Sequence, residues 1–384
     1  MSATSPRPPS PGHSTLSASF FTHLLRPLAR ALRAARASVE EADRRYRKFF
    51  TRTHLAALVY FHLAEVRSSR SLVRFLESLR SLGRLAHWIP THLSCVADAH
   101  NGRKPAAFQA VLAALCRVAQ GRVGHRLPPH LRGVRAVDSS FFRALRSMLW
   151  ARYRKGERGV RMHLAFDPDQ RLPDTLILRP GASDERAAAR RMIRARFTYL
   201  LDRGYPSCWL LQAIAKAKAF FLCRLPIDAP LERVGVHTAR PRGPIREDSL
   251  VLYAPGRPDA VAGRILVIRR PGEEDVLLFT NRFDLDAHEV ANLYRQRWSI
   301  ELFFRWAKSN GADKHWIGRS RNAVHLQLLS KLIAYLLLLL VLHPLTRAVD
   351  LPRALLEIVR TQLFAPARMA LRELRAVPLP WPTS

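Results

Sequence analysis

Four polar residues suited to metal or phosphate chemistry share one face of a segment near residue 300. The segment 286–310, DAHEVANLYRQRWSIELFFRWAKSN, has the apolar periodicity of one long amphipathic helix. At about 100° per residue, its polar residues fall within a stripe roughly 60° wide. They are Tyr294, Arg297, Glu301 and Lys308. A phenol, a guanidinium, a carboxylate and an amine on one face could hold a metal ion and the phosphates around it.

The opposite face of this segment is apolar and is expected to pack on the protein core. It consists of Leu293, Ile300, Phe303, Phe304 and Ala307. Asp286 is expected to cap the helix at its start, because its side chain can accept a backbone N–H. Gly311 is expected to end it.

A plainer interpretation is a solvated helix face with internal ion pairs. Arg297 precedes Glu301, which is the less favourable order for a pair four residues apart. Trp298, Arg305 and Trp306 flank the stripe, and such a surface is costly unless a partner covers it. Both observations favour a binding function.

The spacing Tyr-x2-Arg-x3-Glu-x6-Lys, inside LYRQRWSIELFFRWAK, resembles the signature of the "insertion sequence four" family of bacterial transposases. Two shorter segments also resemble that family: 69–76, with the pattern S-x-S-L-x-x-x-L, and 318–320, Gly-Arg-Ser. The resemblance implies a DDE recombinase with a ribonuclease-H-like core. We therefore expect an α/β fold in which helices flank a mixed sheet.

The composition points to a polyanionic partner. The 384 residues include 63 Lys and Arg against 30 Asp and Glu, which gives a formal charge of +33. An ordinary metabolic enzyme does not need this excess, whereas DNA, RNA or an anionic membrane surface would attract it. With 48% hydrophobic residues, the chain can bury a core of two or three domains.

Cysteine usage and the apolar segments favour a reducing, cytoplasmic location, and the resemblance implies a bacterial protein associated with the nucleoid. The four cysteines show no CxxC spacing, so we expect neither a zinc site nor a disulfide framework. Residues 1–14 lack the apolar stretch of a signal peptide. The apolar run 332–342 has eleven residues, too few to span a bilayer, and is expected to be a buried core helix. No membrane association is expected.

The N-terminal part of the chain has helical periodicity and many arginines. We expect a disordered tail at 1–14 and a helical DNA-binding domain at 15–128, in which a helix enters a groove of DNA. The alternative is a helical packing or dimerisation domain whose arginines are merely solvated. Expected helices include segments that begin near Thr53 and Ser69 and one at about 105–119.

From residue 129 the pattern changes to short apolar, β-branched runs bounded by Pro and Gly. We expect a catalytic domain at 129–322 with three strands, a helix, a strand, a helix and a strand, the element order of a ribonuclease-H-like fold. The expected strands are 134–138 (turning at Ser139–Ser140), 159–167, 174–181, 198–202 and 219–226. The expected helices are 183–197 and 208–218.

A second group of β runs, at about 226–285, is expected to form a small antiparallel subdomain inserted before the helix that carries Glu301. The resembled family has a β insertion at this place. Residues 323–384 are expected to form a C-terminal helical region and a Pro-rich tail.

Three carboxylates fit the chemistry that the resemblance implies. Cleavage of a phosphodiester by two divalent cations needs oxygen ligands that converge at one end of a sheet. Asp138 and Asp202 each follow an apolar strand, and Glu301 lies on the signature helix. They are expected to bind two Mg²⁺ ions, or Mn²⁺ in their place. For either Asp alone, the plainer interpretation is a turn or cap residue.

Other titratable residues compete for these roles. Asp167, Asp169, Asp174 and Asp184 also lie at the ends of expected strands or helices. Asp184 is the strongest rival, but helix capping is the better explanation for it. His163 lies in mid-strand and is expected to be packed rather than catalytic.

The resemblance also assigns binding roles and partners. Tyr294, Arg297 and Lys308 are expected to hold phosphates of a transposon end, and Trp298 either stacks on a displaced base or is buried. Double-stranded DNA at the element's ends and at the target is the expected substrate, bound by a homodimer. The implied activity is end cleavage followed by strand transfer.

Three other functions remain open from the sequence. A catalytically inactive DNA-binding protein would show no metal-dependent nicking. A ribonuclease-H-like nuclease would cleave without strand transfer. A membrane-surface protein would bind anionic liposomes through its charge.

Overall fold

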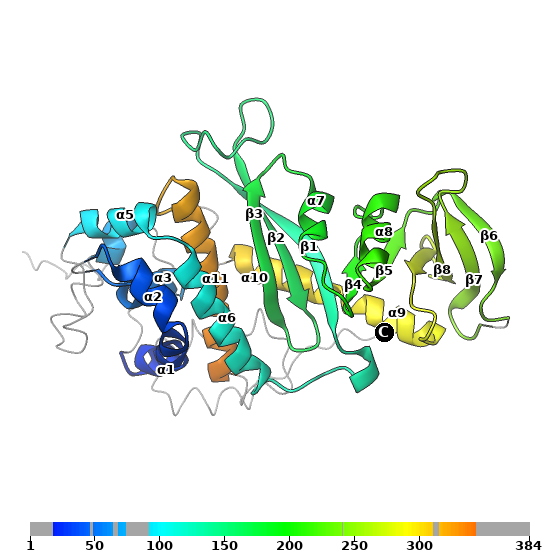
Figure 1. The fold of residues 1–384 in the computed structure, drawn as a ribbon, viewed down its shortest axis with the longest axis horizontal. Coiled ribbons are helices and arrows are strands. Elements are labelled where there is room, and N and C mark those ends of the chain that lie inside the picture. The colour runs from blue at the N-terminus through cyan, green and yellow to red at the C-terminus, as the bar shows by residue number, and fades with distance from the viewer. Residues whose placement is uncertain are drawn as a thin grey trace, which may run out of the picture. The chain divides into compact units, whose positions relative to one another are not determined.

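The computed structural model describes residues 18–46, 49–63, 68–73, 92–239, 241–309 and 315–342 (Figure 1). The chain divides into two compact units. The first comprises Met1–Leu115, Asn310–Ile317 and Leu326–Ser384, and the second comprises Cys116–Ser309 and Gly318–His325. The predicted tails at 1–14 and 377–384 and the predicted helix end at Gly311 lie outside the described residues.

The second unit is built on a mixed sheet, mostly antiparallel, with nine strands in its described residues. Their order across the sheet is β3-β2-β1-β4-β5-β9-β8-β7-β6, and β1, β4 and β5 run parallel. The predicted order of three strands, a helix, a strand, a helix and a strand is confirmed for the first five strands. The strands are β1 (Val134–Arg143), β2 (Gly159–Asp167), β3 (Leu172–Pro180), β4 (Thr198–Leu201), β5 (Phe220–Leu225), β6 (Leu231–Val236), β7 (Ile245–Tyr253), β8 (Val261–Ile268) and β9 (Val276–Thr280).

The predicted insertion does form antiparallel strands, β6 to β9, but it is not a separate small sheet. Strand β9 pairs with β5 in an antiparallel ladder, with Leu222 opposite Thr280 and Leu225 opposite Leu277. The insertion therefore continues the central sheet. Alternating apolar residues predict that a segment is a strand, but they do not predict which strand it pairs with. Here the backbone groups of β5 pair with those of β9, and both strands contribute buried apolar residues to one core.

The first strand was predicted to turn at Ser139–Ser140, and this is wrong. Strand β1 continues to Arg143, because Ser139 and Ser140 pair with His163 and Met162 of β2. The ladder with β2 supplies backbone partners that outweigh the turn preference of serine. Only the pairing of β1 with β4 ends near this point, at Val137 opposite Leu201.

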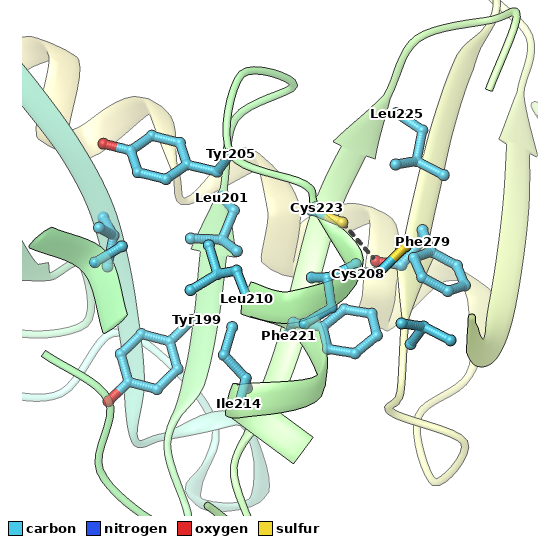
Figure 2. Packing of buried hydrophobic residues seen from close by; sticks show 14 of the residues in the cluster. Tyr199, Leu201, Tyr205, Cys208, Leu210, Ile214, Phe221, Cys223, Leu225 and Phe279 are labelled. Atoms are coloured by element: carbon cyan, nitrogen blue, oxygen red, sulfur yellow. Dashed lines mark hydrogen bonds between the residues drawn. The ribbon is translucent and has the colours of Figure 1, made fainter. Parts of the chain in front are cut away.

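Two helices cover one face of this sheet, α7 (Glu185–Arg190) and α8 (Cys208–Lys216). The helix predicted at 183–197 is thus shorter, because the chain turns after Arg191 to enter β4. Figure 2 shows the buried cluster beneath α8, to which α8 contributes Leu210 and Ile214. The rings of Phe221 and Phe279 lie 5.2 Å apart, so the cluster joins β5 of the first strands to β9 of the insertion.

The single long helix predicted at 286–310 is two helices, α9 (Ala287–Arg295) and α10 (Trp298–Ser309). Asp286 caps α9 as predicted, in a capping box with Glu289. Between the helices, the backbone N–H of Arg297 donates to the carbonyl oxygen of Tyr294 at 3.0 Å. This is a tightened turn of the 3₁₀ type, which apolar periodicity alone does not reveal.

The regular elements among the described residues of the first unit are all helices. They include α1 (Ala18–Ala34), α2 (Arg36–Asp43), α3 (Thr51–Leu63), α5 (Leu93–Gly102), most of α6 (Ala106–Gln120), which is the helix predicted at 105–119, and most of α11 (Arg321–Leu342). The helix predicted from Ser69 lies only partly in the described residues. The His62 ring binds the carbonyl oxygen of Gln327 and the hydroxyl of Ser330, each at 3.0 Å, and so ties α3 to α11.

Helix α11 contains the apolar run that could be mistaken for a membrane span. Among the described residues it is the one helix long and apolar enough to cross a bilayer, over Arg321–Val341. However, 89% of its apolar window is buried inside the protein. This burial supports the predicted core helix, because side chains that face lipid would be exposed here.

A buried polar network joins α2, α3 and the end of α5. The Arg103 guanidinium binds Nδ1 of His54 at 2.8 Å, and Nε2 of His54 lies 2.8 Å from Nδ1 of His100. Arg103 also donates to the carbonyl oxygen of Phe49 at 2.6 Å and to Asp43 at 3.3 Å. Burial, followed by the nearby charge of Arg103, lowers the pKa of His100 from 6.5 to about 4.

This network is expected to make the first unit sensitive to acid. Because the folded pKa of His100 is lowered, the unfolded chain binds a proton more readily below pH 6.5. The stability present above pH 6.5 is therefore lost as the pH falls toward 4, by about 2 kcal/mol from this residue between pH 7 and pH 5. Urea unfolding at the two pH values measures the loss. His100→Gln should show a smaller drop, and an equal drop in both proteins would contradict the prediction.

Candidate active site

Asp138 and Asp202 lie side by side where two parallel strands separate. Val137 of β1 is opposite Leu201 of β4 in the ladder, so the aspartates are the next residues on adjacent strands. Val137 and Leu201 both belong to the cluster under α8. Because side chains alternate along a strand, Asp138 faces the side of the sheet opposite to Val137. By the same alternation, Asp202 faces the side opposite to Leu201, which is also the side of Asp138.

Helix α10 brings Glu301 to that same side. The ring of Phe303 lies 5.3 Å from Phe166 of β2, which packs α10 on the sheet. Phe166 is the register partner of Ala136, two residues before Asp138 and on the same face. Glu301 forms an ion pair with Arg297, whose side chain is 12% exposed. Glu301 is thus held near the aspartates by a cation on the preceding turn.

The charges of these residues act on one another. The pKa of Asp138 is raised from 3.8 to about 6, mainly by burial and further by the negative charges of Asp202 and Glu301. The backbone N–H of Ser139, 2.7 Å from the Asp138 carboxylate, and the charge of Arg297 oppose this rise. For Arg297, burial would lower the pKa, but Tyr294, Asp202 and Glu301 raise it overall. An ionised carboxylate that is destabilised by burial, and further by nearby negative charges, is suited to binding a cation.

The donor set fits divalent metal ions through two of the three carboxylates. The carboxylates of Asp138 and Asp202 are hard oxygen donors, and they follow paired residues of adjacent strands on the same side of the sheet. Glu301 is engaged by Arg297 instead. Within the described ranges, no group of three or more His, Cys, Asp or Glu side chains is arranged to hold a metal ion. Completing such a site requires Glu301 to exchange Arg297 for a cation.

The rival aspartates have structural partners, and three of them, Asp167, Asp169 and Asp174, lie at the opposite edge of the sheet from Asp138 and Asp202. Asp167 and Asp174 accept hydrogen bonds from Arg135 at 2.8 Å, near the start of β1. Asp169 binds the His125 ring at 2.5 Å and two backbone N–H groups. Asp184 caps α7, as predicted, by accepting from the Arg186 N–H at 3.0 Å.

His163 is packed in mid-strand, as predicted. Its side chain is buried in β2, and burial lowers its pKa to about 4, helped by the charges of Arg161 and Arg179. A neutral, buried imidazole on the α7 side of the sheet is poorly placed for the carboxylate chemistry.

The other residues of the predicted stripe lie on both helices. Tyr294 is half-buried on α9, and its hydroxyl donates to the carbonyl oxygen of Leu201 at 3.4 Å, next to Asp202. Trp298 is 50% exposed at the start of α10, with the Arg305 guanidinium 5.9 Å from its ring. Of the two alternatives given for Trp298, burial in the core is therefore wrong. Lys308 is exposed near the end of α10, two turns beyond Glu301.

A cavity of about 590 Å³ opens beside Asp202 and extends along the insertion strands. Tyr294, Arg297 and Trp298 line it on the helix side. Four further cations that line it were not singled out from the sequence: Arg224, Arg269, Arg270 and Arg295. Because arginine is abundant throughout the chain, these four residues do not stand out in the sequence. The adjacent pair Arg269–Arg270, directly after a β run, is the one signal that could have identified any of them.

Comparison with known proteins decides the family. Residues 129–337, more than half of the chain, match the family described as the transposase DDE domain. The chain belongs to this family. The match covers all three predicted carboxylates and the signature stripe. The protein is therefore a DNA transposase, an enzyme that acts on DNA.

Two relatives of this transposase carry matching names. It is 31% identical over 327 residues to y4zB of Sinorhizobium fredii (strain NBRC 101917 / NGR234), which is named as a transposase; the alignment covers 80% of this chain and 87% of the relative. It is 27% identical over 223 residues to a Geobacillus stearothermophilus protein named as the transposase for insertion sequence element IS5377. That alignment covers 57% of this chain and 58% of the relative.

Membership explains two features of the transposase. DNA as partner accounts for the charge of +33. The family generally uses divalent metal ions, which suits the pair of adjacent aspartates at this edge of the sheet.

The transposase fixes its signature helices through a buried arginine of the insertion. Arg264 on β8 makes a two-pronged ion pair with Asp248 on β7, at 2.6 and 2.8 Å, and both side chains are fully buried. The same guanidinium donates to the carbonyl oxygen of Leu285 at 2.5 Å, just before the cap of α9. Arg282, in the same loop, donates to the hydroxyl of Thr198 at the start of β4, at 2.8 Å. The insertion therefore anchors the loop from which α9 begins.

Proposed function

We propose that this transposase belongs to the insertion sequence four family, with a ribonuclease-H-like core, and that Asp138, Asp202 and Glu301 are its catalytic carboxylates. The observation that carries the proposal is the placement of the two aspartates at adjacent positions of parallel strands, with the field of Glu301 acting on Asp138. The element order β1-β2-β3-α7-β4-α8-β5 supports the fold assignment.

The reaction is metal-dependent cleavage at the ends of an insertion sequence, followed by strand transfer. Two Mg²⁺ ions, or Mn²⁺ in their place, would activate the attacking oxygen and stabilise the leaving 3′ oxygen. Asp138 and Asp202 would hold these ions, and Glu301 would complete the site. In the first step water attacks phosphorus and a 3′-OH leaves. In the second, that 3′-OH attacks a phosphorus of target DNA or of the opposite strand, and the 3′ oxygen of the attacked strand leaves as a new 3′-OH.

The signature residues would position the DNA. Arg297 is paired with Glu301 here, and it would turn to a phosphate when Glu301 binds metal, since a guanidinium suits either anion. Tyr294 lies beside Asp202 through its contact with Leu201 and would bind the same phosphate region. Lys308, exposed two turns along α10, would contact phosphates further from the cut.

The arrangement of domains and partners follows from the same proposal. Residues 15–128 would form the domain that recognises DNA ends, 129–322 the catalytic domain, and 323–384 a C-terminal helical region. The enzyme would act as a homodimer on double-stranded DNA, in the bacterial cytoplasm in association with the nucleoid. The charge of +33 and the buried α11 are consistent with DNA rather than a membrane as the polyanion.

The test compares two aspartates with different roles. Asp138→Asn should abolish Mg²⁺-dependent cleavage of a duplex that carries the element's ends and should retain binding to it. Asp184→Asn is the matched control, because asparagine caps a helix as well as aspartate does. Loss of cleavage in the Asp184 variant alone would overturn the assignment. Binding without cleavage by the wild-type protein would indicate an inactive DNA-binding copy, and cleavage without strand transfer a nuclease.

Trp298 gives a separate prediction about binding. Trp298→Ala should weaken binding of a duplex with frayed, single-stranded ends by about 5- to 150-fold, because stacking on one base is worth about 1–3 kcal/mol. The half-exposed ring contributes little to the core, so the unfolding midpoint should not change. Fluorescence anisotropy at fixed salt measures the affinity. A fully paired duplex is the control, and equal losses for both duplexes would show that Trp298 does not stack on a displaced base.

A further inference from the structure

A second groove lies on the face of the sheet away from the carboxylates. It has a volume of about 470 Å³ and runs between α7 and α8. Its lining residues are Arg190, Ile193, Trp209, Gln212, Lys216 and two alanines, Ala213 and Ala217. The Trp209 ring is 39% exposed there. An exposed indole beside two cations and an amide is a common composition for binding nucleic acid.

The groove lies within a wider surface of exposed cations, which we call the α7–α8 basic face. In the described part of the chain, none of these cations forms an ion pair with an acidic side chain. Arg194, by contrast, is paired with Asp174 and is not included. The members of the face are Arg190, Arg191, Arg196, Lys216 and Lys218. Unpaired positive charge at this density attracts a polyanion.

This face is remote from the candidate active site in two ways. Helices α7 and α8 pack on the side of the sheet opposite to α9 and α10 (Figure 1). The backbone N–H of Arg196 also donates to the carbonyl oxygen of Lys218 at 2.9 Å, in the loops that enter β4 and β5. Asp202 follows the other end of β4, about 13 Å along a four-residue strand. One short DNA segment at the carboxylates would not also occupy this face.

Two of these cations occupy backbone conformations that favour glycine. Arg196 has φ 68° and Lys218 has φ 55°, both in the left-handed region. The sequence thus places long basic side chains at two adjoining turns where glycine would be less strained. A basic residue at a position strained in this way supports a binding role beyond local structure.

We propose that the α7–α8 basic face binds the phosphate backbone of a second DNA segment while the first occupies the carboxylate edge. The proposal rests on the identity of the protein as a DNA transposase, which must bring two DNA segments together to join them. Arg190 and Lys216 would contact phosphates, and Trp209 would pack against the sugar or base edge in the groove. The face makes no use of Asp138, Asp202 or Glu301.

The experiment loads full-length protein with unlabelled duplex carrying the element's ends and then titrates a labelled duplex without those ends. Arg190→Gln combined with Lys216→Gln should weaken capture of the second duplex by about tenfold or more, and should reduce the salt slope by about 2. Cleavage of the first duplex should keep its wild-type rate, which separates failure of this proposal from failure of the proposed active site. Capture of the second duplex at wild-type affinity by the double variant would overturn the proposal.

Two further proteins exclude a general effect of charge or folding. Arg246→Gln combined with Arg257→Gln removes the same charge from exposed arginines that are already paired with Asp275 and Asp259, and should leave capture unchanged. Lys218→Gly should weaken capture while its unfolding midpoint stays the same or rises, because glycine relieves the left-handed backbone. An equal loss in the control protein would overturn the proposal. So would tighter binding of this face to anionic phospholipid vesicles, or to RNA, than to DNA.

Discussion

Replacing Glu301 with glutamine is expected to reduce the rate of DNA cleavage by about a thousandfold or more. The change keeps the size of the side chain and removes the charge that would complete the metal site. A loss of several kcal/mol of transition-state stabilisation corresponds to this factor, since each 1.36 kcal/mol is tenfold. Single-turnover cleavage in Mg²⁺ measures the rate, and anisotropy measures binding, which should be retained. Glutamine also releases Arg297 from its ion pair, so the affinity for DNA should be equal to that of the wild type or slightly higher.

The control for this variant is Glu289→Gln. Glu289 lies on α9 and belongs to the capping box with Asp286, and its contacts are local to that helix end and to His130. Its substitution should leave the cleavage rate within a few fold of wild type. Cleavage by the Glu301 variant at a similar rate would remove Glu301 from the catalytic set and leave the two aspartates to be assigned a different third ligand.

Replacing Arg264 with methionine is expected to destabilise the second unit by about 3–5 kcal/mol. Both members of the Arg264–Asp248 pair are fully buried, so removal of one leaves an uncompensated charge. Urea unfolding at pH 7 measures the loss. Burial would raise the pKa of Asp248, but hydrogen bonds from Arg264 and Thr238 lower it overall. The contribution of the pair should therefore persist above about pH 4 and disappear as the pH falls below it.

The matched comparison is Arg246→Gln, because the Arg246 side chain is exposed and its pair with Asp275 should contribute under about 1 kcal/mol. Replacing Arg264 and Asp248 together with apolar residues should restore much of the stability. It should not restore cleavage, because the donor to the Leu285 carbonyl that fixes the start of α9 is still missing. Recovery of both properties would mean that Arg264 has no positioning role.

The residues of the candidate site could be selected from the sequence because their chemistry is local. Asp202 follows an apolar run that becomes β4, and the Tyr–Arg–Glu–Lys spacing survives although α9 and α10 are separate helices. The turn at Gln296–Arg297 keeps nearly helical geometry, so the offsets still bring Arg297 and Glu301 together. Asp138 was placed at the end of a strand, yet it lies in mid-strand, where only the pairing with β4 ends.

What the sequence could not supply depends on contacts between distant segments. The pairing of β9 with β5 joins residues more than 50 positions apart, and no pattern within either strand names its partner. The link from Arg264 to Leu285 has the same character, because one arginine among many gives no sign that it is buried. The four arginines that line the cavity outside the signature, and the cations of the α7–α8 basic face, likewise come from separate segments that show no recognisable motif.

The continuity of the sheet has a consequence for shortened copies of the gene. Strand β5 has β4 on one side and β9 on the other, so the insertion is what closes its second edge. A chain that lacked β6 to β9 would present the backbone of β5, with Phe221 and Cys223 beneath it, as an open edge able to pair with another chain. Such truncated proteins would self-associate through β5 and be removed by proteolysis. The insertion thus acts as a covering edge that keeps the protein dispersed, in addition to any contact it makes with DNA.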